Sequence, residues 1–360
     1  MLRNLCIFSF ILALVSCGGG SSAIKNTNNS GNSVVGSSAS SNASSNIVTN
    51  VSSAAEASVS SAEVSSSNSS IASSAQGGEP QNDQLYGMYV SLNTGRTNAL
   101  LDNVEREDQF IKFVRDNGFN YIIFYDLEGL NPTSTTAKQF AALVSRAKLT
   151  AGVRSVATAL GDVSEADTIV AYNNGRPESE RINVLNVEYE FWNMPDRATA
   201  FNNTIAMLEH FKSVGMVHDL QTEIYVGWIN ATEAVRLGNV TDRILVHYYM
   251  QTDVTIINYG LERLEWLSAA SRKVKIAPIF SNEGPKNTND IPFMGCWLEK
   301  NPHQQAYKSW REQYDALNKP WKENIEVVGA TWFIYDKFLD VKNLNGNQSG
   351  GVISNGCDVQ

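Results

Sequence analysis

The segment RINVLNVEYEFW, Arg181–Trp192, runs from an apolar β-strand directly into two acidic residues, and the interpretation of the fold starts from it. Strand side chains alternate, so Asn186, Glu188 and Glu190 are predicted to share one face, whose earlier positions are apolar. Polar groups at the end of a core strand are costly to desolvate, and neighbouring carboxyls push each other's pKa values apart. This pattern favours a catalytic carboxyl pair over rim glutamates in salt bridges.

Further apolar runs with strand character lie on both sides of this segment, and amphipathic helical stretches separate them. Eight strands alternating with seven helical stretches predict an α/β fold with a single parallel (β/α)8 barrel, a TIM barrel, over residues 83–360. A doubly wound open sheet is the alternative, but no glycine-rich phosphate turn follows the first strand. The predicted strands are Leu85–Ser91, Phe119–Asp126, Gly152–Ala157, Ile182–Glu188, Glu223–Trp228, Arg243–Tyr249, Val274–Phe280 and Val327–Phe333.

Glycines predict where two of the helices end. Gly118 and Gly215 each follow a helical stretch, in the position that favours a left-handed backbone conformation. The predicted helices include Asn98–Asn117, Thr135–Lys148, Asp196–Val214 and Tyr259–Ser271.

Polar and aromatic residues gather at the predicted C-terminal strand ends, where a parallel barrel holds its active site. Tryptophan rings there are platforms for sugars, whose C–H faces stack on aromatic surfaces. We therefore predict that Glu190 and Glu188 are catalytic and that Tyr249 converges with them on one pocket; the catalytic role of Tyr249 is what the resemblance described next implies. The predicted substrate-binding residues are Asn186, Trp228, His247, Trp332, Asp126 and Glu283.

Several short motifs resemble those of family 18 glycoside hydrolases, the chitinases and endo-β-N-acetylglucosaminidases. The family's strand-four Asp-x-Asp-x-Glu is similar to Asn186-x-Glu188-x-Glu190, in which both aspartates are replaced. Its strand-six pattern resembles Asp242-x-Ile244-x-Val246-x-x-Tyr249, and its Ser-x-Gly-Gly corresponds to Ser155-Val156-Ala157-Thr158. Its strand-eight Gly…Trp resembles Gly329-Ala330-Thr331-Trp332, with the tryptophan one residue early.

The resemblance implies a glycoside hydrolase in which Glu190 is the general acid that protonates the glycosidic oxygen. Glu188 would orient an acetamido group of the substrate, which acts as the nucleophile. Tyr249 would hydrogen-bond that group, and Trp332 would stack under the sugar ring.

Two other functions fit the same residues. In a retaining glycosidase that resembles cellulases and β-galactosidases, Glu283 would be the nucleophile and would work with Glu190 or Glu188. A non-catalytic glycan-binding lipoprotein would keep Trp228 and Trp332 but would not need paired carboxylates.

The N-terminal residues 1–17 resemble a bacterial lipoprotein signal peptide. A positive start at Arg3 and a short apolar stretch lead to Leu14-Val15-Ser16-Cys17, which resembles a lipobox. The resemblance implies a lipid on Cys17 and, because Gly18 rather than Asp follows, sorting to the bacterial outer membrane, facing the periplasm or the cell surface. Residues 18–82 are almost entirely Ser, Ala, Asn, Gly and Val and are predicted to be a disordered tether.

The net charge and the cysteine content limit the partners that can be expected. The net charge of −9 argues against nucleic acid. After removal of Cys6 and acylation of Cys17, the exported chain retains Cys296 and Cys357, which are predicted to form a disulfide. The histidines show no ligand spacing with the cysteines, so no metal and no other cofactor is expected. The expected partners are a polysaccharide or glycan substrate and, through its lipid, the membrane; the protein is predicted to be a monomer.

Overall fold

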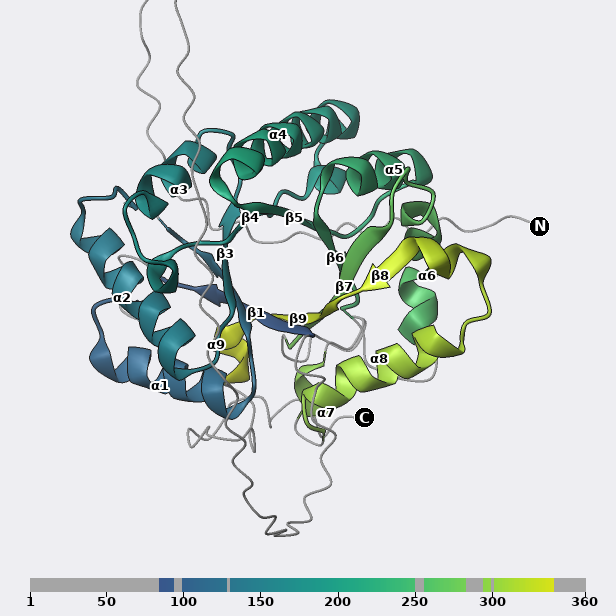
Figure 1. Cartoon of the computed structure of the whole chain (residues 1–360). Coiled ribbons are helices and arrows are strands. Elements are labelled where there is room, and N and C mark those ends of the chain that lie inside the picture. Colours follow the sequence, from purple (N-terminus) through teal and green to yellow (C-terminus); the bar gives the residue numbers. More distant parts are fainter. Residues whose placement is uncertain are drawn as a thin grey trace, which may run out of the picture. The chain divides into compact units, whose positions relative to one another are not determined.

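The computed structural model describes residues 84–93, 99–127, 130–249, 256–282, 294–298 and 301–339. Within them, parallel strands form a closed barrel surrounded by helices, which confirms the predicted TIM-barrel fold (Figure 1). The predicted signal peptide, Cys17 and the tether 18–82 lie outside the described residues. None of the described helices combines the length and the apolar composition needed to cross a membrane.

The strands pair in chain order, and the sheet closes between the last strand and the first. The strands are β1 Leu85–Ser91, β2 Tyr121–Tyr125, β3 Ser155–Leu160, β4 Val184–Val187, β5 Gln221–Val226, β6 Arg243–His247, β7 Val274–Ser281, β8 Ile325–Val327 and β9 Gly329–Phe333. All pairs are parallel, and β9 pairs with both β1 and β7. The predicted strands correspond to these elements, with ends that differ by a few residues.

The last predicted strand, Val327–Phe333, is divided in two. β8 pairs only with β7, whereas β9 pairs with β7 and β1. At the division the backbone of Gly329 has φ +146, and a Cβ there would lie 1.8 Å from the Leu85 carbonyl oxygen. Glycine is therefore required where the barrel closes.

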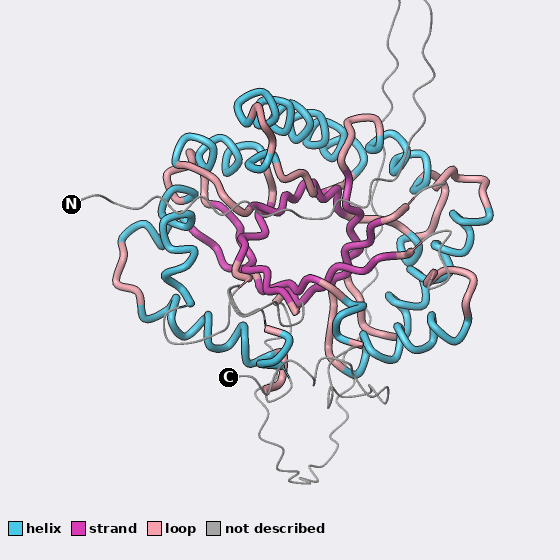
Figure 2. Tube along the Cα trace, turned by 180° about the vertical axis from the view of Figure 1, so that it is seen from behind, coloured by secondary structure: helices cyan, strands magenta, loops and turns pink. Residues whose placement is uncertain are grey.

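The helices form a ring outside the strands, as Figure 2 shows from behind. Side chains cap several of them; Asn230 and Glu233, for example, form a complete capping box at the start of α5. The α-helices are α1 Val104–Asp116, α2 Thr135–Thr150, α3 Glu165–Asn173, α4 Arg197–His218, α5 Ala231–Val240, α6 Ile256–Leu267, α7 Gly295–Leu298, α8 Gln304–Ala316 and α9 Tyr335–Phe338, and the short 3₁₀ helices are η1 Glu178–Glu180, η2 Phe191–Asn193 and η3 Pro320–Asn324.

The two predicted helix-ending glycines differ in outcome. Gly118 follows α1 with φ +72, as predicted. The prediction for Gly215 is wrong, because α4 continues to His218 and Asp219 takes the left-handed conformation with φ +56. Gly215 is needed for packing instead, since a Cβ there would lie 2.3 Å from the Leu220 carbonyl oxygen.

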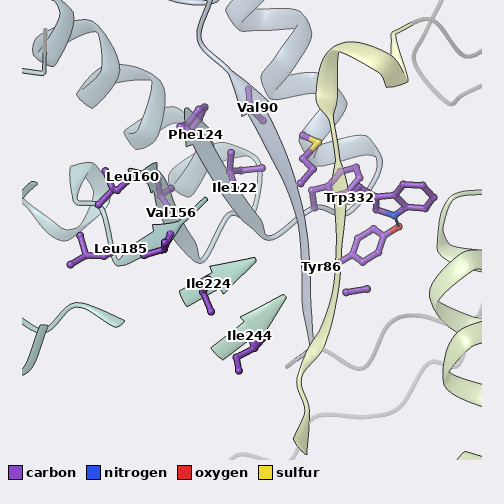
Figure 3. Packing of buried hydrophobic residues seen from close by; sticks show 14 of the residues in the cluster. Tyr86, Val90, Ile122, Phe124, Val156, Leu160, Leu185, Ile224, Ile244 and Trp332 are labelled. Carbon is purple, nitrogen blue, oxygen red and sulfur yellow. Dashed lines mark hydrogen bonds between the residues drawn. The ribbon is translucent and has the colours of Figure 1, made fainter. Parts of the chain in front are cut away.

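Buried side chains form two layers on opposite faces of the strands. One cluster takes alternate strand residues such as Tyr89, Ile123, Tyr225 and Leu245 and contains no residue of the surrounding helices, so it fills the barrel. The other combines the intervening strand residues with residues from the helices and lies between the barrel and the surrounding helices (Figure 3). Both faces of each strand are therefore buried, as is usual in a parallel sheet.

Candidate active site

The predicted carboxyl pair lies where β4 ends. The backbone N–H of Glu188 donates to the Leu160 carbonyl at 3.2 Å, which extends the strand pairing by one residue. Glu190 instead precedes η2, so a turn rather than strand alternation places its side chain. The amide of Asn193 donates to Oε2 of Glu190 at 2.6 Å. The predicted common strand face thus holds for Asn186 and Glu188 but does not extend to Glu190.

The surroundings of the two glutamates give them different proton affinities. Burial, followed by repulsion from Glu190 and Asp126, raises the pKa of the Glu188 carboxyl to about 7. Burial also raises the pKa of Glu190, but the hydrogen bond from Asn193 opposes this shift by favouring the charged form. Glu188 is therefore the member of the pair that carries a proton close to neutral pH.

Asp126, which acts on Glu188, follows β2 and is held from the neighbouring strand. Its backbone has φ +61, and the hydroxyl of Ser91 donates to its Oδ2. Ser91 in turn accepts from the backbone N–H of Asn93 at 3.0 Å, and the Asn93 amide donates to Oδ2 of Asp336 at 3.2 Å. Acidic groups thus reach the mouth from the ends of β2, β4 and β9, and the end of β1 supplies their hydrogen-bond partners Ser91 and Asn93.

Tyr225 on β5 lies between the carboxyls and Tyr249, and it is not among the site residues predicted from the sequence. Burial raises its pKa well above the usual value, followed by the charges of Glu190 and Glu188. It shares a side-chain hydrogen bond with Tyr249, and the two rings stack with centroids 6.1 Å apart. The sequence did carry a signal for Tyr225. On the predicted strand that begins at Glu223, the alternation of side chains places Tyr225 on the same face as Glu223.

Aromatic rings continue from Tyr225 along the rim. Trp192 packs edge-on against Tyr225 at 5.6 Å, and His247 lies 4.1 Å from Tyr249 between centroids. Burial, and then the charge of Arg263, lowers the pKa of His247 to about 3, so its imidazole is neutral at physiological pH. Trp228 lies 5.9 Å from His247 and is 52% exposed. The structure therefore brings Trp228, His247 and Tyr249 together at the mouth of the barrel.

Asn186 is not available to a substrate. Its side chain is fully buried; Oδ1 accepts from the Tyr89 hydroxyl at 3.2 Å and Nδ2 donates to Oε1 of Glu223 at 2.7 Å. Glu223 is also fully buried and accepts from the Tyr121 hydroxyl at 2.6 Å and from Nε of Arg243. The prediction that Asn186 binds substrate is wrong, because its hydrogen-bonding groups belong to this network inside the barrel.

Trp332 faces away from the mouth. It is fully buried in the outer cluster, and its indole N–H donates to the Tyr86 hydroxyl at 3.0 Å, beside which Figure 3 shows it. Its ring packs against Phe280 and Phe338 at 5.4 and 5.3 Å. The prediction that Trp332 floors the sugar site is wrong. The next residue, Phe333, faces the mouth and stacks on Tyr249 at 6.1 Å.

Two further predictions remain untested. Glu283 and Cys357 lie outside the described residues, so the two-glutamate alternative and the disulfide with Cys296 stay predictions. Across the described part of the chain, no group of three or more His, Cys, Asp or Glu side chains is placed to hold a metal ion.

Comparisons with known proteins reveal likeness in fold. No protein-family model matches the chain, and no curated protein matches it significantly. Among solved structures, it is similar to a β-glucuronidase from Bifidobacterium dentium (10% identity, TM-score 0.41, 69% of this chain and 40% of that one). A glycosyl hydrolase family 2 member from Bacteroides cellulosilyticus gives 14% identity and a TM-score of 0.40, over 70% of this chain and 27% of that one. A D-allulose 3-epimerase from Methylomonas sp. gives 11% identity and a TM-score of 0.38, over 70% and 84%. The chain spans less than half the length of the two hydrolases.

Proposed function

We propose that this protein is a glycoside hydrolase whose carboxyl pair is Glu188 and Glu190. The observation that carries the proposal is the environment of Glu188, a carboxyl at a barrel mouth whose pKa of about 7 results from burial and two neighbouring carboxylates. Cleavage of a glycosidic bond uses two carboxyl groups with separated proton affinities. One protonates the leaving oxygen, and the other remains charged while positive charge develops on the sugar.

The separation of proton affinities favours one assignment of roles. Glu188 would donate the proton, and Glu190, whose charged form Asn193 favours, would stabilise the developing charge or orient the nucleophile. The family resemblance implies the reverse order, with Glu190 as the acid and Glu188 behind a substrate acetamido group. In either order two hydroxyls are suited to bind polar groups of the sugar: that of Tyr225, which the charges of both carboxyls reach, and that of its hydrogen-bond partner Tyr249.

We also propose where the protein is located. The lipobox supports a lipid on Cys17 that would hold the enzyme on the outer membrane. Labelled fatty acid should enter the wild-type chain but not the Cys17→Ser chain, and labelling of both chains would contradict this assignment.

The test of the activity uses the full chain extracted in detergent and incubated with chitin oligomers, N-glycans and neutral polysaccharides. New reducing ends should appear with one of these substrates. Glu188→Gln and Glu190→Gln should each lower the rate, by about 10²–10⁴-fold for the acid. Glu209→Gln, on the exposed face of α4, is the matched control and should keep full activity. Full activity in both site variants would contradict the proposal.

Trp228 favours a second candidate, a glycan-binding protein, because a 52% exposed indole at the rim suits binding without cleavage. The two functions separate in one measurement. A hydrolase with Glu188→Gln should bind the glycan but not cleave it. A binding protein should bind equally well with either residue and release no reducing ends in the wild type.

A further inference from the structure

Trp228 is unusual because it is both exposed and firmly supported. Among the described residues, the other large apolar side chains that are more than half exposed, such as Val104 and Met216, lie at helix ends, where single exposed apolar residues need no explanation. Trp228 lies instead between β5 and α5 at the barrel mouth, packed against His247 and Tyr259.

A buried cation lies against the indole. Arg263 on α6 is 4% exposed, and its guanidinium lies 5.3 Å from the centroid of the Trp228 ring. The guanidinium donates to the carbonyls of Gly227 at 3.0 Å, His247 at 2.7 Å and Tyr259 at 3.1 Å. These bonds join the ends of β5 and β6 to α6 directly behind the tryptophan. A cation close to an aromatic ring stabilises its position.

The backbone of Trp228 is held as well. Its carbonyl accepts from Arg197 at 2.9 Å, and Arg197 also donates to both carboxylate oxygens of Glu233. Glu233 closes the capping box of α5, so the loop that carries Trp228 is tied to the helices on both sides. An indole that is fixed in this way loses little conformational freedom when a ligand binds.

The position of Trp228 relative to the carboxyls decides which sugar it would contact. Its ring contacts His247, whose ring lies 6.0 Å from that of Tyr225. Val187 on β4 pairs with Ile224 on β5, so Tyr225 is level with Glu188 on the neighbouring strand, and the charges of Glu188 and Glu190 reach it. Trp228 is therefore separated from the carboxyls by two ring contacts. A sugar ring at the carboxyls would not cover it, whereas a neighbouring sugar of the same chain would.

We propose that Trp228 forms a separate subsite, on which a pyranose ring of a glycan chain stacks at least one unit away from the bond that is cleaved. The substrate is then an oligosaccharide or polysaccharide chain rather than a single terminal glycoside. This inference rests on the proposed hydrolase function, and it names the substrate class of that site.

The test compares chain lengths. The wild-type full chain and Trp228→Ala are assayed on a series from the shortest cleaved substrate to a hexasaccharide of the same glycan. The substitution should lower kcat/KM on the longest substrates by about 10–100-fold, since it removes a stacked aromatic face, and leave the shortest unchanged. Trp228→Phe should recover part of the loss. Leu149→Ala, a 72% exposed residue at the end of α2, is the control and should behave as wild type.

The outcomes separate the subsite from the activity. An equal loss on short and long substrates, or no loss on long ones, would overturn the subsite while the hydrolase assignment stands. If the wild type cleaves nothing, calorimetry measures the binding of the same series to Glu188→Gln and to the double variant Glu188→Gln, Trp228→Ala. A length-dependent affinity that disappears with the tryptophan supports the subsite, and an unchanged affinity overturns it.

Discussion

The carboxyls of Glu188 and Asp126 repel one another at the mouth of the barrel, from the ends of β4 and β2. This repulsion adds to burial and to the charge of Glu190 in raising the pKa of Glu188 to about 7. Alternate strands of such a barrel contribute side chains to one layer, so residues distant in sequence become electrostatic neighbours. A residue from another strand thus contributes, after burial and Glu190, to the proton affinity of the proposed acid.

The first prediction concerns the pH dependence of activity. If protonated Glu188 is the acid, the rate should fall as pH rises through about 7. Asp126→Asn removes a negative neighbour and makes the charged form of Glu188 easier to reach, so the alkaline limb should move to lower pH. The pH–rate profiles of the wild type and the variant provide the measurement. An unmoved limb would show that Asp126 does not act on the catalytic proton.

The second prediction concerns stability. A carboxyl whose pKa is about 7 in the folded chain and 4.5 when unfolded binds its proton more tightly in the folded state, so it destabilises the fold as pH rises between these values. No penalty exists below about pH 4.5, and the whole penalty is present above about pH 7. Glu188→Gln should therefore increase the free energy of unfolding by about 1–3 kcal/mol at pH 8 and by much less at pH 5. Urea titrations at both pH values test this; a gain of equal size at both would rule out the ionisation as its cause.

The third prediction concerns the ion pair of Glu223 and Arg243 inside the barrel. Arg243→Met leaves a buried carboxylate with neutral partners only and should cost about 3–5 kcal/mol of unfolding free energy. The double variant Glu223→Leu, Arg243→Met should be destabilised less than the sum of its single variants, because it leaves no unpaired charge. Additive losses in the double-mutant cycle would show that the two residues do not interact energetically.

The fourth prediction separates Trp332 from the active site. Trp332→Phe loses buried volume and the hydrogen bond to Tyr86, and it should lower the free energy of unfolding by about 1–3 kcal/mol. Turnover measured well below the unfolding temperature should remain close to wild type, because the ring lies among Phe280 and Phe338 on the helix side. A large loss of turnover with unchanged unfolding would instead return Trp332 to the substrate site.

Local patterns were sufficient for much of the architecture. β1 spans Leu85–Ser91 as predicted, and the other strands follow their apolar runs, because a strand buried on both faces needs a continuous apolar segment. The acidic residues at the end of β4 could also be recognised in the sequence, because Glu188 interrupts an apolar run at the strand end where a parallel barrel holds its active site.

The continuous apolar character of the strands also explains why the predictions for Trp332 and Asn186 were wrong. Strands that are apolar on both faces carry no polar alternation to show which residues point inward, so nothing local assigned Trp332 to the outside and Phe333 to the mouth. On β4 the polar Asn186 marked the inner face, but only the neighbouring strands supplied Tyr89 and Glu223, which occupy its amide.

The alternation of strands and helices, and the carboxyls at the end of β4, were thus determined by the sequence itself, because they depend on local periodicity and residue type. Tertiary structure alone decided which residues of β9 face inward, the division at Gly329, and the electrostatic influence of Glu188, Asp126 and Tyr225 on one another. Those features depend on how the barrel closes, since closure sets the distances between strands that are far apart in the chain.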